Sequence, residues 1–101
     1  MVVTKTLEEK VLNVKVEGKL DTVTAPELEA ELAEVIDEAD ELIFDFDGLE
    51  YVSSAGLRIL LATEKIMKSK GGMKVINVSA VIMEIFDITG FSDILTIEQQ
   101  F

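Results

Sequence analysis

The chain contains neither cysteine nor histidine among its 101 residues. Without cysteine it has no disulfide, no thiolate ligand for a metal and no cysteine nucleophile. Without histidine it lacks the side chain that most often serves as general base and as metal ligand. A serine hydrolase that relies on a Ser–His pair is therefore excluded, and we expect a protein that is not an enzyme, with no metal and no cofactor.

Long hydrophobic runs and basic charge are also scarce. No apolar stretch approaches the length of a membrane span, and the first residues lack the layout of a signal peptide. We therefore expect a cytoplasmic protein without membrane insertion. Twenty acidic against nine basic residues give a formal net charge of −11, which repels phosphate backbones and disfavours nucleic acid as a partner. A protein partner with an electropositive patch is favoured instead.

The apolar share is 49%, enough for the core of one domain, which we expect to span residues 1–101. Short apolar or alternating runs predict strands at residues 2–6, 11–17, 42–46 and 73–78, and residues 95–97 could add a last edge strand. The segment 7–10 is short enough to join the first two strands as an antiparallel hairpin.

Signals for three helices lie between and after these strands. Thr24 can cap the first helix, with Pro26 in its first turn and Glu27 completing a capping box. That helix is expected to end near Ala39. Its apolar face carries Leu28, Leu32, Val35 and Ile36.

The second helix is predicted to start at residues 53–56 and to end before Gly71–Gly72. The third runs from about residue 80 to 89, with Ser79 as its cap and Gly90 in the left-handed position that follows it. The core face of the second helix is predicted to consist of Gly56, Ile59, Leu60, Thr63, Ile66 and Met67.

This alternation of strands and helices predicts an α/β fold with right-handed crossovers. The sheet is expected to be mixed but mainly parallel, with an antiparallel hairpin at its N-terminal side. Three or more helices must cover its apolar surface.

Two adjacent serines, Ser53 and Ser54, lie where a strand gives way to the second helix. The first turn of a helix has unpaired N–H groups and partial positive charge, which stabilise a phosphate or another anion. One serine can simply cap the helix while the other faces outward, so the two roles are compatible. Leu57 and Leu61 share a flank of this helix, as core edge or as a small exposed patch; core edge is favoured for Leu57, and neither is favoured for Leu61.

The segment Tyr51–Leu61, YVSSAGLRILL, resembles the signature of the STAS domain found in bacterial anti-sigma factor antagonists. Further similarity lies in GKLD at residues 18–21 and in FDITGF at residues 86–91. The resemblance covers nearly the whole chain in order, and it implies the STAS fold.

The resemblance also implies a function in transcription regulation through partner switching. In this family, a serine at this helix start is phosphorylated by an anti-sigma factor that is a serine kinase. The unphosphorylated antagonist binds the anti-sigma factor, phosphorylation releases it, and a phosphatase restores binding. The implied acceptor is Ser54, with Ser53 as the alternative, because Ser53 stands where many antagonists have aspartate.

Asp21 matches the family's aspartate near the acceptor, although it could equally serve to turn its own loop. We expect a monomer that binds its partner through Asp21, Ser53, Ser54, Ala55, Gly56, Leu57, Arg58 and Leu61. An alternative function is that of a STAS accessory module in a transporter or lipid-transport system.

Overall fold

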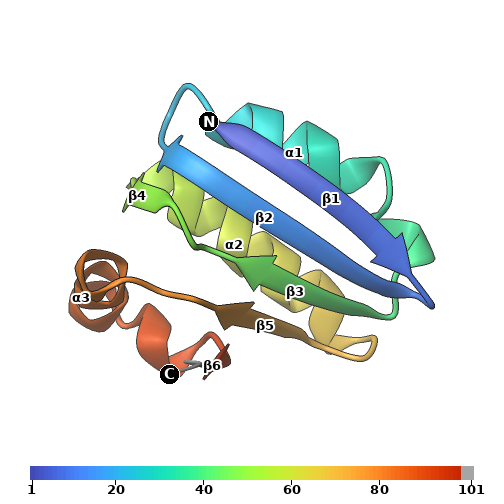
Figure 1. Cartoon of the computed structure of the whole chain (residues 1–101). Helices are drawn as coiled ribbons and strands as arrows, with labels where there is room; N and C mark the ends of the chain where they lie inside the picture. The colour runs from blue at the N-terminus through green and yellow to red at the C-terminus, as the bar shows by residue number, and fades with distance from the viewer. Residues whose placement is uncertain (99–101) are drawn as a thin grey trace.

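The structure is a computed structural model that describes residues 1–98 (Figure 1). Six strands and three α-helices alternate along the chain, together with two short 3₁₀ helices. In chain order the elements are β1 (Val2–Glu8), β2 (Val11–Leu20), α1 (Ala25–Ala33), η1 (Ile36–Glu38), β3 (Glu41–Asp45), β4 (Leu49–Val52), α2 (Ser54–Lys68), β5 (Met73–Ile76), α3 (Ala80–Thr89), η2 (Phe91–Asp93) and β6 (Ile97–Glu98).

The predicted α/β class and mixed sheet are confirmed. The sheet order is β1-β2-β3-β5-β6, in which β1 pairs antiparallel with β2 and the remaining pairs are parallel. The hairpin turn is tighter than predicted, because Glu8 pairs with Val11 and only Glu9 and Lys10 connect the strands. Both turn residues have positive φ, 50° and 67°, the backbone that a two-residue hairpin turn requires.

One strand of this sheet, β4, was not predicted. The ten-residue strand β2 serves two parallel partners in succession: its first half, Val11–Lys15, lies against β3, and its end, Gly18–Leu20, lies against β4. A turn at Asp47–Gly48 separates the two partners, and Gly48 has a φ of +92° there, where a side chain would be strained. The path from β3 to β4 is therefore one interrupted strand that runs along β2.

The helices α1 and α2 lie side by side on one face of the sheet, and α3 lies beside β4 (Figure 1). Alternate residues of the strands point into this helical layer and are fully buried, among them Leu12, Val14, Phe44 and Val75. Phe46 links the central strand to α3, because its ring centroid lies 5.4 Å from that of Phe44 and 6.4 Å from that of Phe86. One continuous core therefore joins all three helices to the sheet.

The first helix begins after Thr24 as predicted, but its capping box and its end differ from the prediction. The capping box was wrong: Thr24 has helical backbone angles and makes no cap hydrogen bond. The helix also ends at Ala33 rather than near Ala39, and the chain tightens into η1. Lys70 stabilises that segment, since its ammonium group donates to the carbonyls of Ile36 and Ala39 at 2.7 and 2.9 Å.

The core face of α2 is confirmed for Gly56, Leu60, Thr63 and Met67, which are buried. The Thr63 hydroxyl donates to the Ile59 carbonyl at 2.7 Å, which satisfies this polar group inside the core. The prediction was wrong for Ile66, whose side chain is 46% exposed. Ile66 instead lines a shallow groove between α1 and α2.

The C-terminal elements lie within two residues of their predicted positions. Ser79 caps α3 by accepting from the N–H of Ile82 at 3.3 Å, and Gly90 has the expected left-handed backbone. The strand β5 is two residues shorter than predicted, and the edge strand lies at residues 97–98 instead of 95–97. Asn77 explains the shorter β5, because its φ of 56° is incompatible with an extended strand.

Candidate functional site

The end of β2 fixes the position at which α2 begins. Beside it, β4 runs parallel and pairs Lys19 with Tyr51 and Leu20 with Val52. The next N–H, that of Ser53, donates to the Leu20 carbonyl at 2.8 Å. The first turn of α2 and the loop that follows β2 are therefore held side by side.

Ser53 is the residue that caps α2. Its backbone is extended, and its hydroxyl accepts from the N–H of Gly56 at 3.3 Å. That bond satisfies one of the amide groups that a helix start leaves unpaired. The half-buried hydroxyl of Ser53 thus already has a structural role.

Ser54, the first residue of α2, has a different environment. Its side chain is exposed to solvent, and within residues 1–98 its hydroxyl has no hydrogen-bond partner. The two adjacent serines are therefore not equivalent: one hydroxyl is used by the helix, and the other is free to react or to be bound.

Small residues let this first turn approach β2 closely. A Cβ atom on Gly56 would lie 2.7 Å from Leu20 Cγ and 2.9 Å from the Leu20 carbonyl oxygen, distances that no side chain tolerates. Leu57 is also buried, at 7% exposure, in keeping with the favoured core-edge position, while Ala55 and Leu61 are half-buried. Gly56 and Leu57 are thus the buried residues of this first turn, and Arg58, the next residue, is exposed.

Asp21 organises the neighbouring loop. Its carboxylate accepts from the N–H groups of Val23 and Thr24 at 3.0 and 3.1 Å. The Thr24 hydroxyl in turn accepts from the Asp21 N–H at 2.8 Å and lies 2.8 Å from the Lys19 carbonyl oxygen. The hydrogen bond from the Thr24 N–H is the main reason that the pKa of Asp21 lies below its usual range. The loop-turning role considered for Asp21 is thus present in the structure.

Two exposed apolar side chains near the serines were missed by the sequence reasoning. Val23, in the Asp21 loop, is 77% exposed, and Tyr51, at the end of β4, is 46% exposed. In the sequence, they stand out only as apolar residues that fit no helical or strand periodicity, as Val23 does in DTVT at residues 21–24. Such side chains suit contact with another protein.

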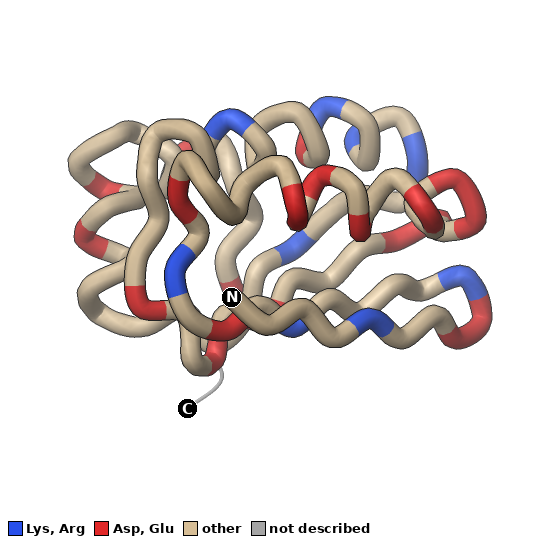
Figure 2. The backbone as a smooth tube through the Cα atoms, turned by 90° about the horizontal axis from the view of Figure 1, so that it is seen from above, with Lys and Arg blue, Asp and Glu red and all other residues tan. Residues whose placement is uncertain are grey.

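Charge is divided between the two helices of the covering layer. Basic residues gather along α2, whereas acidic residues follow α1 and the segment after it (Figure 2). The α2 sequence contains Arg58, Lys65 and Lys68 against a single acid, Glu64. In a chain of net charge −11, this helix is a local positive strip that begins one turn after Ser54.

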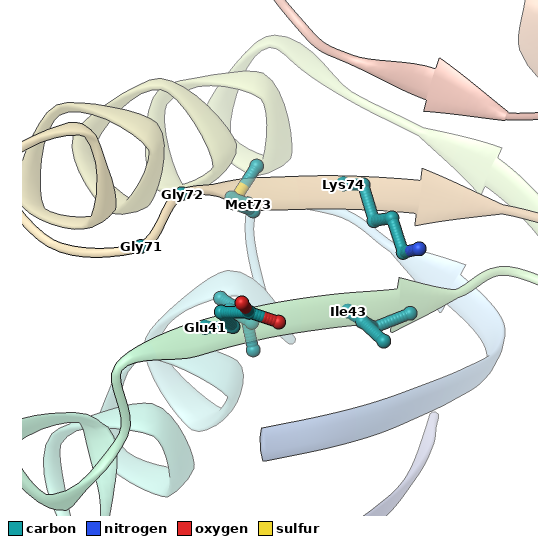
Figure 3. A pocket seen from close by; sticks show the side chains of 7 residues that line it. Glu41, Ile43, Gly71, Gly72, Met73 and Lys74 are labelled. Atoms are coloured by element: carbon teal, nitrogen blue, oxygen red, sulfur yellow. The ribbon is translucent and has the colours of Figure 1, made fainter. Parts of the chain in front are cut away.

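Another hollow lies away from the serines, at the amino ends of β3 and β5. It has a volume of about 210 Å³ and is lined by Glu41, Ile43, Gly71, Gly72 and Lys74 among others (Figure 3). The serines, in contrast, follow the carboxyl end of β4. In the part of the chain that the structure describes, no acidic cluster is suited to hold a metal ion, and no helix is both long and apolar enough to cross a membrane.

Comparison with known proteins gives consistent results. The anti-sigma-B factor antagonist of Bacillus subtilis is 32% identical over 87 residues, which cover 85% of this chain and 80% of that protein. The crystal structure of an anti-sigma factor antagonist from Mycobacterium paratuberculosis has a TM-score of 0.84 at 29% identity, covering 95% of this chain and 83% of the other.

More distant structures share the fold alone. SpoIIAA of Bacillus in its phosphorylated form has a TM-score of 0.77 at 15% identity, covering 99% of this chain and 92% of the other. A sulfate transporter family protein from Wolinella succinogenes has a TM-score of 0.76, also at 15% identity, covering 94% of this chain and 82% of the other. The family model described as the STAS domain matches residues 3–101, and with this match over nearly its full length the chain belongs to the STAS domain family.

Proposed function

We propose that this protein is an anti-sigma factor antagonist whose binding is switched by phosphorylation of Ser54. The exposed, unpartnered Ser54 hydroxyl at the start of α2 carries the proposal. Because Ser53 already caps the helix, Ser54 can be modified without loss of a structural hydrogen bond. Homology to the antagonists of 29–32% identity supports this function over the transporter-associated alternative, for which the Wolinella protein offers a likeness of fold alone.

The physical basis of the switch is a local change of charge. A phosphate adds about −1.5 to −2 charges, and the start of a helix accommodates negative charge well. The fold therefore tolerates the modification, whereas an interface packed against a neutral hydroxyl does not. A loss of about 4 kcal/mol at that interface would weaken binding roughly a thousandfold.

The proposed partner is an anti-sigma factor with serine kinase activity, and a phosphatase reverses the modification. The antagonist itself acts as a monomeric, single-domain binding module and not as an enzyme. Its contact surface includes Ser54, Ala55, Arg58 and Leu61, with the Asp21 loop beside them, whereas Ser53, Gly56 and Leu57 position the helix. The net charge of −11 favours a partner with an electropositive binding face.

The test uses an anti-sigma factor of the serine kinase type from the same organism. Incubation with this kinase and ATP should add one phosphate to wild type, to Ser53→Ala and to Ser69→Ala, but none to Ser54→Ala, as measured by intact-mass and peptide mass spectrometry. Ser69 is the matched control, because it is an exposed serine at the other end of α2.

A pull-down provides the second measurement. The anti-sigma factor should be retained by wild type and by Ser54→Ala and lost with Ser54→Asp. A Ser54 that stays unmodified in the presence of a kinase that binds the protein, or a phosphate found on Ser53, would overturn the proposal.

A further inference from the structure

Arg58 is the one arginine of the chain. It is exposed on α2, and in the part of the chain that the structure describes it forms no ion pair, although the chain contains twenty acidic residues. The salt bridges of the described residues all involve lysines, at positions 5, 15 and 74. An unpaired arginine in so acidic a protein is available to bind an anion.

Arg58 follows Ser54 by four residues within the same helix. Side chains at this spacing lie on one face, with their Cβ atoms about 5–6 Å apart. Helical side chains also lean toward the N-terminus and cover the turn before their own Cα. The guanidinium group of Arg58 can therefore extend back over the turn that begins with Ser54.

The neighbouring charged groups do not compete for this arginine. The Asp21 carboxylate is held by hydrogen bonds within its own loop. Glu64 lies six residues beyond Arg58, which places it on another side of the helix. Lys65 is eleven residues from Ser54, about 16 Å along the axis, too far to contact a group on that serine.

We propose that Arg58 binds the phosphate of phosphorylated Ser54 within the same chain, as a bidentate clamp. The planar guanidinium group matches two phosphate oxygens, which a lysine ammonium group does not. This inference rests on the proposed phosphorylation at Ser54 and adds a residue that controls its lifetime. The clamp favours the dianionic phosphate and must open before a phosphatase can reach the phosphorus atom.

The test incorporates phosphoserine directly at position 54 during translation, so that no kinase is needed. The second ionisation of the phosphate is followed by ³¹P NMR between pH 4 and pH 8. We expect the titration midpoint in Arg58→Gln to lie about half a pH unit above that of wild type. Arg58→Lys should fall between the two, and Lys65→Gln, the charge-matched control on the same helix, should equal wild type.

A kinetic measurement gives a second readout. A general serine phosphatase should release phosphate from the Arg58→Gln protein about two- to fivefold faster than from wild type, with no change for Lys65→Gln. Circular dichroism spectra verify that each variant is folded. Equal midpoints and equal rates in wild type and Arg58→Gln would overturn the clamp and leave the proposed function intact. A kinase that ignores Ser54 would overturn the proposed function, while a difference in midpoints would still establish the ion pair.

Discussion

The hydroxyl of Ser53 accepts a hydrogen bond from the Gly56 N–H at 3.3 Å, and the hydroxyl next to it, on Ser54, has no partner within residues 1–98. This arrangement separates the structural residue of the site from the residue proposed to be modified. It also makes the two serines distinguishable by stability measurements alone.

We expect Ser53→Ala to lower the free energy of unfolding by about 1 kcal/mol, because the helix loses its cap. Ser54→Ala should change it by less than about 0.5 kcal/mol, as is typical of exposed positions. Urea denaturation followed by circular dichroism measures both values. Ser79→Ala is the matched control for a lost cap, since Ser79 caps α3 in the same way. Equal losses for the two adjacent serines would contradict this assignment.

Gly56→Ala tests the close approach of α2 to β2. An unhindered alanine would stabilise a helix by up to about 1 kcal/mol relative to glycine. Here the added methyl group would overlap Leu20 and Val52, so we expect a net loss of about 1–3 kcal/mol in the free energy of unfolding. Thermal unfolding measures the change, and a stabilised variant would show that the helix start can move away from β2.

Asp21→Asn tests the loop beside the site through its pH dependence. The folded protein holds the pKa of Asp21 below its unfolded value, so the ionised carboxylate stabilises the fold above about pH 4 and this contribution is lost as the pH falls through the folded pKa. The variant should be less stable than wild type at pH 7, and the difference should shrink toward pH 3. Urea midpoints at several pH values measure it, with the exposed Asp37→Asn as control. A difference that does not change with pH would contradict the assignment.

For Glu64→Gln we expect the opposite effect on stability at neutral pH, namely a gain. Burial raises the pKa of Glu64, against a smaller opposing effect of Lys68, and its Oε2 atom is shielded without a hydrogen-bond partner among the described residues. Because the folded pKa lies above the unfolded one, the charged carboxylate destabilises the fold at neutral pH. The variant should therefore melt at a higher temperature than wild type at pH 7. The gain should vanish near pH 4, and the exposed Glu29→Gln should show none.

Much of the fold was predictable because local signals agreed with one another. Apolar periodicity located the strands that form the core, and Ser79 and Gly90 marked both ends of α3. The strand β4 was missed because only four residues form it and its two central residues are exposed. Its existence depends on pairing with the end of β2, which no local pattern encodes.

For the helices and the site as well, local patterns were predictable and contacts between distant segments were not. A helical projection places Ile66 on the core face of α2, but α1 ends at Ala33 and a groove remains beside Ile66. The motif located both serines, yet a shift of one residue in the helix start decides which of them is the cap. The exposed Val23 and Tyr51 could be associated with the site only once β2 and β4 were seen to bring their segments together.

The pairing of β3 and β4 with β2 fixes which residue of the chain begins α2. We expect the turn at Asp47–Gly48 to accept an extra residue, because it lies between the two regions of β2 that pair with β3 and β4. An insertion between Val52 and Ser53 cannot be absorbed, since Val52 is anchored opposite Leu20. Such an insertion would put the inserted residue at the capping position, move Ser53 to the exposed first position of α2 and move Ser54 to the half-buried position that Ala55 now occupies. The two hydroxyls are chemically identical. The number of residues that separates each serine from the Leu20–Val52 pair therefore determines which hydroxyl other molecules can reach.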